Sequence, residues 1–177
     1  MPLLFIPLFF LMVQQVISQE SFTRRYTINE GLPGNSIHSI FKDQFGFLWL
    51  GTNSGLARFN GTNFHYYTAQ DGMAGQKVTH IAEDAHGNLW LACGEKGLSI
   101  FDGVDFYNYN TSSGLINNEI TAFHYIEETD EMMIGTENGL SVYRSNGFSS
   151  FHQQLNNINQ RLQVTDFLRQ DDNILVY

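Results

Sequence analysis

The chain alternates between short apolar runs and turns rich in Gly, Asn and Asp. The run Leu48–Leu50 leads into the turn GTNSGL, Leu89–Leu91 leads into ACGEKGL, and the run at 132–134 leads into GTENGL. Apolar runs of this length between turn residues are typical of β-strands, whereas an amphipathic helix would show apolar residues at a spacing of about 3.6. The pattern therefore predicts an all-β protein.

The same order of strand and turn repeats along the chain. Trp90 follows Trp49 by 41 residues, Met133 stands 43 residues further on, and Leu175 stands 42 residues beyond that. Each repeat divides into four short apolar segments, and four strands at a period of roughly 40 to 45 residues are typical of a propeller blade. We predict β-propeller blades of four antiparallel strands in an incomplete ring of about three and a half blades.

The repeats divide the chain into segments. The apolar run at 3–13 is too short to span a bilayer and suits a signal peptide, so residues 1–18 are predicted to direct export. Residues 19–177 are predicted to form a partial β-propeller, with a leading outer strand at 21–30, blades at 31–70, 71–112 and 113–152, and a partial blade at 153–177. Because propellers close with typically four to eight blades, we expect a fragment whose missing blades belong to the same protein.

Three kinds of position are expected to maintain the repeat. An Asp begins the type I turn between the first two strands, where its carboxylate can accept from the backbone. A large apolar residue in the second strand is buried between neighbouring blades, and a Gly closes the next turn. These positions are Trp49, Trp90, Met133, Gly55, Gly97, Gly139, Asp43 and Asp84.

Composition and charge exclude some classes of function. Because only nine Lys and Arg residues are present and the formal net charge is −9, a sequence-independent grip on nucleic acid or anionic lipid is not expected. Cys93 is the one cysteine of the chain, so no intrachain disulfide can form, and we expect a buried thiol.

Three segments share one motif. They are GLPGNSI with IFKDQFGFLWLGTNSGLARF, then VTHIAEDAHGNLWLACGEKGLSIFDG, then GLINNEIT with MMIGTENGLSVY. These segments resemble the two-component regulator propeller repeat, which is found in extracytoplasmic sensor regions of bacterial histidine kinases and hybrid two-component proteins. The chain departs from the pattern at Ala92 and Cys93, where Gly and Thr are expected, and in ETDEMM, which lacks the turn Gly.

The resemblance implies a sensing module on the periplasmic or extracellular face of a bacterial inner membrane. It also implies that the full-length form is a homodimer and that the ligand is an oligosaccharide or another small molecule. Full-length relatives of this kind continue into a transmembrane helix and a kinase or DNA-binding output, so a parent protein could be a histidine kinase. No kinase activity is assigned to these residues.

Propeller geometry points to one end of the blades for a ligand site. The loops that enter the first strand and those that join the second and third strands converge there, and they carry amides and carboxylates suited to hydroxyl-rich ligands. The same side chains cap turns in many propellers. The candidates are Asn35, Gln76, Asn118, Thr52, Asn53, Glu95, Lys96, Glu137 and Asn138.

No catalytic, cofactor or metal motif is recognised. The six His residues do not recur at one repeat position, and the acidic run at 127–131 lacks the alternating ligands of a Ca²⁺ loop. We therefore predict no enzyme activity, cofactor or metal for these residues. Two alternatives stay open: part of a secreted propeller enzyme acting on polysaccharide, which needs a converging carboxylate pair, and a passive scaffold for protein interaction.

Overall fold

The computed structural model describes residues 24–34, 36–145, 147–151, 163–170 and 173–176. The predicted signal peptide at 1–18 and the candidate Asn35 lie outside these residues. Within them the chain forms three four-stranded sheets and one two-stranded sheet, and every strand pairs antiparallel with its neighbour. The prediction of an all-β fold is confirmed.

The sheets follow the order of the chain, and within each four-stranded sheet consecutive strands are neighbours. The first sheet contains β1 (Ile37–Lys42), β2 (Leu48–Thr52), β3 (Gly55–Phe59) and β4 (Phe64–Tyr67). The second contains β5 (His80–Glu83), β6 (Leu89–Ala92), β7 (Leu98–Phe101) and β8 (Phe106–Tyr109). The third contains β9 (Ile120–Ile126), β10 (Glu131–Thr136), β11 (Gly139–Arg144) and β12 (Gly147–Phe151). The hairpin consists of β13 (Phe167–Gln170) and β14 (Asn173–Val176).

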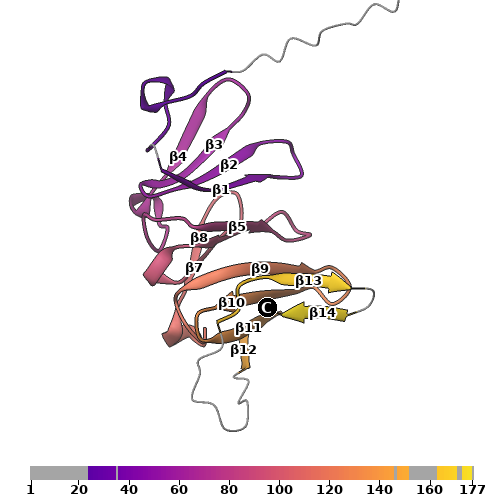
Figure 1. Cartoon of the computed structure of the whole chain (residues 1–177). Helices are drawn as coiled ribbons and strands as arrows, with labels where there is room; N and C mark the ends of the chain where they lie inside the picture. Colours follow the sequence, from indigo (N-terminus) through magenta and orange to yellow (C-terminus); the bar gives the residue numbers. More distant parts are fainter. Residues whose placement is uncertain (1–23, 35, 146, 152–162, 171–172, 177) are drawn as a thin grey trace, which may run out of the picture.

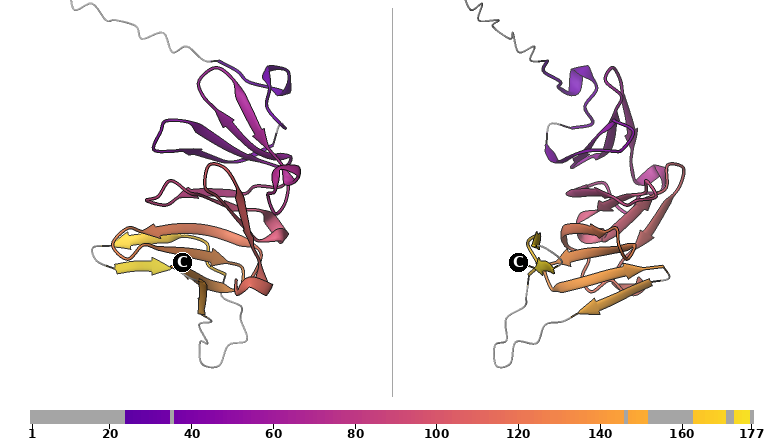
Figure 2. Two further views of the ribbon diagram at one scale, coloured as in Figure 1. Left: turned by 180° about the vertical axis from the view of Figure 1, so that it is seen from behind. Right: turned by 90° about the vertical axis from the view of Figure 1, so that its right-hand side faces the viewer.

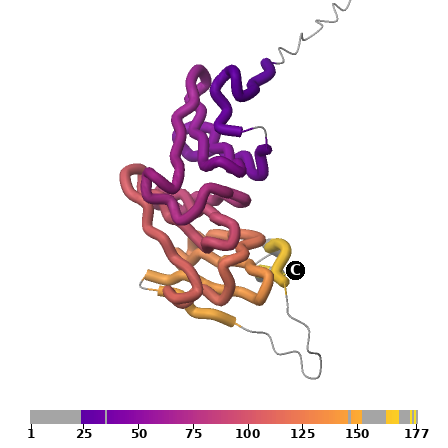
Figure 3. The backbone as a smooth tube through the Cα atoms, turned by 90° about the vertical axis from the view of Figure 1, so that its left-hand side faces the viewer, coloured from indigo at the N-terminus to yellow at the C-terminus, as the bar shows by residue number. Residues whose placement is uncertain are grey.

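The sheets stack one on the next, as blades do in a propeller (Figure 1). Two further views show the same succession from the first sheet to the third, with the hairpin beside β9 (Figure 2). The backbone tube passes through the sheets in sequence order without returning to an earlier one (Figure 3). Backbone bonds join successive blades, because the N–H of Val78 donates to Thr52 O at 2.8 Å and that of Val164 donates to Thr136 O at 2.9 Å.

A short 3₁₀ turn precedes each four-stranded sheet. The turns η1 (Ile28–Glu30), η2 (Ala69–Asp71) and η4 (Thr111–Ser113) each begin after a side chain that accepts from the backbone, and each ends at a left-handed Gly. A fourth turn, η3 (Gly94–Lys96), lies between β6 and β7. The sequence analysis expects an outer strand at 21–30, but the described residues 24–30 form no strand. The capping box of η1 holds this segment in a turn, and no neighbouring strand pairs with it.

The core lies between the sheets. One cluster of buried side chains, including Trp49, Leu56 and Leu91, fills the space between the first and second sheets. A second cluster, including Trp90 and Ile134, fills the space between the second and third. Because alternate residues of a strand point to opposite faces, each middle strand supplies side chains to two interfaces. This explains why the middle strands are apolar at consecutive positions.

The Asp that begins the first turn of a blade also binds the Trp of the next strand. Asp84 Oδ1 accepts the backbone N–H groups of His86 at 3.0 Å and Asn88 at 2.9 Å, while Oδ2 accepts the indole N–H of Trp90 at 2.9 Å. Asp43 makes the same bond to the indole of Trp49 at 2.7 Å. Sequence reasoning found the turn role of these residues but not the indole bond. In the third blade Met133, which has no donor, takes the place of Trp.

Among the residues that the structure describes, no helix has the length and apolarity needed to cross a bilayer.

Candidate functional site

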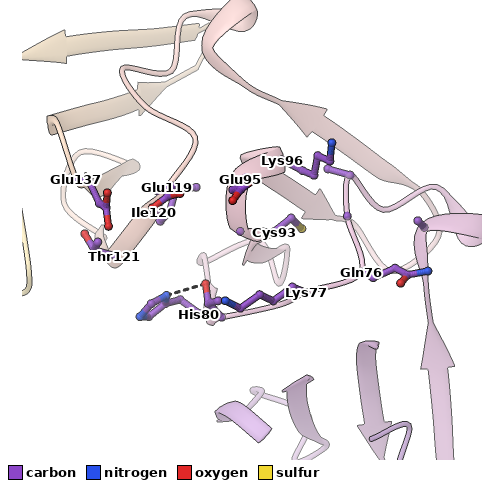
Figure 4. A pocket seen from close by; sticks show the side chains of 15 residues that line it. Gln76, Lys77, His80, Cys93, Glu95, Lys96, Glu119, Ile120, Thr121 and Glu137 are labelled. Atoms are coloured by element: carbon purple, nitrogen blue, oxygen red, sulfur yellow. Dashed lines mark hydrogen bonds between the residues drawn. The ribbon is translucent and has the colours of Figure 1, made fainter. Parts of the chain in front are cut away.

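A groove of about 620 Å³ opens between the second and third sheets. The loops entering β5 and β9 border it, together with the segments that follow β6 and β10 (Figure 4). Because β-strands alternate in direction, these four segments all lie at the same end of the stacked sheets. Its lining includes Gln76, Lys77, His80, Glu95, Lys96, Glu119, Thr121 and Glu137.

Four of the nine candidate residues meet in this groove. They are Gln76, Glu95, Lys96 and Glu137. Gln76 precedes the strand β5, Glu95 and Lys96 belong to η3, and Glu137 follows β10. The loop entering β9 also borders the groove, but its candidate Asn118 does not line it.

Three of the other described candidates bond within their own loops. Thr52 is fully buried, and its hydroxyl donates to Gly55 O at 2.9 Å. Asn118 Oδ1 accepts the backbone N–H of Thr111 at 2.9 Å, and the N–H of Asn138 donates to Thr136 Oγ1 at 3.2 Å.

Asn53 belongs to the first blade, where its Oδ1 lies 2.6 Å from His38 Nε2. It does not line the groove.

Sequence reasoning missed Lys77 and Glu119. Each directly follows a candidate residue, and the two occupy the same position in consecutive repeats. The backbone N–H of Glu137 donates to Glu119 O at 3.1 Å, so a direct bond holds these two acidic residues side by side at one edge of the groove. A charged residue at this position in two successive repeats was the signal that could have revealed them.

The groove combines carboxylates and ammonium groups with one half-buried imidazole. Glu95, Glu119 and Glu137 supply acceptors, and Lys77 and Lys96 supply donors. This set can hydrogen-bond a polar, hydroxyl-bearing ligand from several sides. Within the described residues no group of three or more His, Cys, Asp and Glu side chains is placed to hold a metal ion.

Cys93 forms part of the groove lining, but its thiol belongs to the core. The residue is 2% exposed, and its Sγ lies 3.3 Å from Ser99 Oγ. Burial raises the pKa of the thiol, which disfavours the reactive thiolate. The arrangement gives Cys93 a packing role beneath the groove.

His80 and His86 lie at opposite ends of the second sheet. We expect the pKa of one to lie below the ordinary value of 6.5 and that of the other to lie above it. Burial lowers the pKa of His80. The hydrogen bond that His86 Nε2–H donates to Asp130 Oδ2, at 3.2 Å, raises the pKa of His86, and the carboxylate charge adds to the shift. Titration of the imidazole C–H signals by NMR checks both midpoints, and Asp130→Asn should lower that of His86 alone.

The sign of each contribution to stability follows from these directions. Since the folded pKa of His86 is raised, its contribution is fully present below the unfolded pKa and is lost as pH rises through the folded value. Since the folded pKa of His80 is lowered, protonation opposes folding as pH falls below the unfolded value. Equal midpoints for the two rings would contradict this assignment.

The comparisons with known proteins agree with the repeat and the fold. The model of the two-component regulator propeller family matches residues 31–54 and 72–95. These two segments match the two-component regulator propeller repeat. They contain the first two blade turns, with Asp43 and Asp84, and the strands that carry Trp49 and Trp90. The predicted resemblance is confirmed. No curated protein sequence matches the chain.

Solved structures from B. thetaiotaomicron share the fold. One, described as the extracellular domain of a hybrid two-component system, is 23% identical, with a TM-score of 0.73 over 88% of this chain and 22% of that one. Another such extracellular domain is 18% identical, with a TM-score of 0.66 over 86% of this chain and 20% of that one. The chain therefore spans about a fifth of the length of these domains. At these identities the likeness establishes propeller-type sheets and nothing about ligands.

Proposed function

We propose that the chain is the ligand-sensing propeller module of an extracytoplasmic two-component signal transduction protein. The observation that carries the proposal is the groove of about 620 Å³ between two propeller blades, where four sequence-predicted ligand residues meet. The matched repeats and the likeness to extracellular domains of two-component systems support it. The proposed location is the periplasmic or extracellular face of a bacterial inner membrane, reached through the predicted signal peptide.

The proposed ligand is an oligosaccharide or another small hydroxyl-rich molecule. Glu119 and Glu137 on the third blade and Glu95 and Lys96 on the second stand on opposite blades that border the same groove. Carboxylates accept from sugar hydroxyls and ammonium groups donate to them, so a ligand in the groove would bridge the two blades. A ligand that contacts both blades can favour one packing of the blades over another, which is what sensing requires.

The proposed partners are further blades of the same protein and, in the full-length form, a second copy of it. The outer face of the first sheet supports the first of these. Leu50 and Ala57 pack with Leu32 on this face, whereas their strand neighbours Trp49 and Leu56 pack against the second sheet. Ile40, which pairs with Leu50, is 65% exposed there. An apolar sheet face of this kind is what a neighbouring blade covers.

Calorimetric titration of the chain with a panel of neutral oligosaccharides tests the proposal. We expect at least one to bind saturably, and the double variant Glu119→Gln, Glu137→Gln to weaken that binding by about ten-fold, the loss of two charge-assisted hydrogen bonds. Asn53→Ala, which alters a polar residue of the first blade outside the groove, is the matched control and should bind as the unaltered chain does. Binding that survives the double variant, or none across the panel, would reject this site.

The same titrations separate the two alternatives. A propeller enzyme would shorten the bound oligosaccharide, and chromatography of the titrated mixture would show the products. A passive scaffold would bind no sugar. No feature of the described residues favours either alternative over sensing, and the prediction of no enzyme activity stays a prediction.

A further inference from the structure

A second groove, of about 310 Å³, lies between the same two sheets at their other end. It is bordered by the turns that join β5 to β6, β7 to β8 and β9 to β10, which antiparallel connection places opposite the first groove. No residue lines both grooves. The side chains that matter here are His86, Trp90, Asp102, Tyr107, Tyr125 and Asp130.

Aromatic rings form much of the wall. Trp90, Tyr109 and Tyr143 pack against one another, with centroids of Trp90 and Tyr143 5.1 Å apart and those of Tyr109 and Tyr143 5.9 Å apart. Tyr107 on the neighbouring strand is 48% exposed. A ring exposed in this way can offer part of its π surface to a ligand.

Two carboxylates line the same groove as these rings. Asp102 accepts the hydroxyl of Tyr107 at 3.3 Å, and Asp130 accepts that of Tyr125 at 2.6 Å while its other oxygen lies 3.2 Å from His86 Nε2. Both carboxylates are exposed. Asp102 Oδ1 already accepts two backbone N–H groups, but Asp102 Oδ2 and both oxygens of Asp130 each keep a further lone pair with which they can accept. None of the described residues that line the groove is a lysine or an arginine.

We propose that this second groove binds an organic cation, namely a protonated primary amine. Carboxylates beside an exposed aromatic face are the combination that attracts an ammonium group, through charge-assisted hydrogen bonds and cation–π contact together. The formal net charge of −9 favours the approach of a cation. His86 can balance the charge of Asp130, but a neutral polyol would leave that of Asp102 without a counterpart. In the first groove Lys77 and Lys96 accompany the carboxylates, which distinguishes the two sites.

The test is a titration of the whole chain with n-butylammonium chloride at low salt, followed by NMR of the two indole N–H signals. We expect saturable binding that moves the Trp90 signal, because Trp90 lines the groove, and leaves that of Trp49 in place. The neutral analogue n-butanol should bind about ten-fold more weakly or not at all, since it lacks the charge. Equal affinity for the two compounds would overturn the proposal.

Three variants localise the binding. Asp102→Asn with Asp130→Asn removes both charges, and Asn suits the backbone at position 130, where φ is 55°. We expect this pair of substitutions to reduce the affinity for n-butylammonium about ten-fold and Tyr107→Leu to reduce it several-fold. Because Tyr107 is exposed, Tyr107→Leu keeps the fold and still tests the site if the double variant does not fold. Glu95→Gln removes one charge in the first groove and should leave affinity unchanged. If it weakens binding as much as the pair does, the attraction is diffuse and the second groove is not a site.

Discussion

Gly97→Ala is expected to destabilise the chain by about 3 kcal/mol, the upper part of the range for a non-Gly residue in a conformation that only Gly adopts readily. Gly97 has φ +91° and ψ −133°, at the end of η3. A Cβ added there would lie 2.4 Å from the backbone oxygen of Tyr109, so backbone strain and a clash with backbone act together. Urea unfolding followed by circular dichroism measures the change in the free energy of unfolding.

Gly103→Ala is the matched control in the same blade. Its φ is +98°, but a Cβ built there meets nothing within 4 Å. Only the cost of the left-handed backbone remains, so we expect about 1 kcal/mol. If the two variants lose the same amount, the contact with Tyr109 has no influence and the turn at 97 tolerates a side chain.

Asp84→Ala is the second substitution with a large expected effect, a loss of about 3 kcal/mol. Without this carboxylate the indole N–H of Trp90, which is 4% exposed, has no acceptor, and two backbone N–H groups lose their partner. A buried donor left unpaired costs the full free energy of its desolvation, about 1–3 kcal/mol, in addition to the lost turn bonds. Thermal and urea unfolding both report this loss.

Asp102→Ala is the control that distinguishes the contribution of the turn hydrogen bonds from that of the indole hydrogen bond. Asp102 accepts backbone N–H groups from Val104 and Asp105, each at 2.8 Å, but it is exposed and contacts no indole. We expect a much smaller loss there than for Asp84→Ala, as for an exposed turn bond. In a double-mutant cycle, Asp84→Ala should cost much less in a Trp90→Phe background, because the buried donor is then absent. An unchanged cost in that background would show that the indole bond contributes nothing.

The two grooves share one blade interface, so binding in one groove can be tested for an effect on binding in the other. Both are formed by the second and third sheets, one at each end. Because Glu95 and Asp130 lie in separate grooves, the sugar and the cation titrations fail or succeed independently. Binding at both ends in the same sample would further show whether occupancy of one groove changes affinity at the other, as coupling through a shared interface requires.

The sequence by itself determined the blade. Strand length, turn chemistry and the spacing of Trp49 and Trp90 are local properties, and they predicted four antiparallel strands per repeat. The sequence also predicted at which end of a blade the loops with Gln76, Glu95 and Glu137 lie, because strand direction alone decides this.

Only the tertiary structure decided which of those loops meet. The packing of the second blade on the third brought Glu95 and Glu137 to one groove and left Asn53 elsewhere, since a groove is formed by two sheets and not by one repeat. Packing also buried Trp90 with its indole N–H toward Asp84, where burial required an acceptor. The segment at 28–30, part of the strand expected at 21–30, forms a 3₁₀ turn. A strand requires a hydrogen-bonded neighbour, and no described strand pairs with this segment, although Tyr26 packs against Phe59 and Phe64.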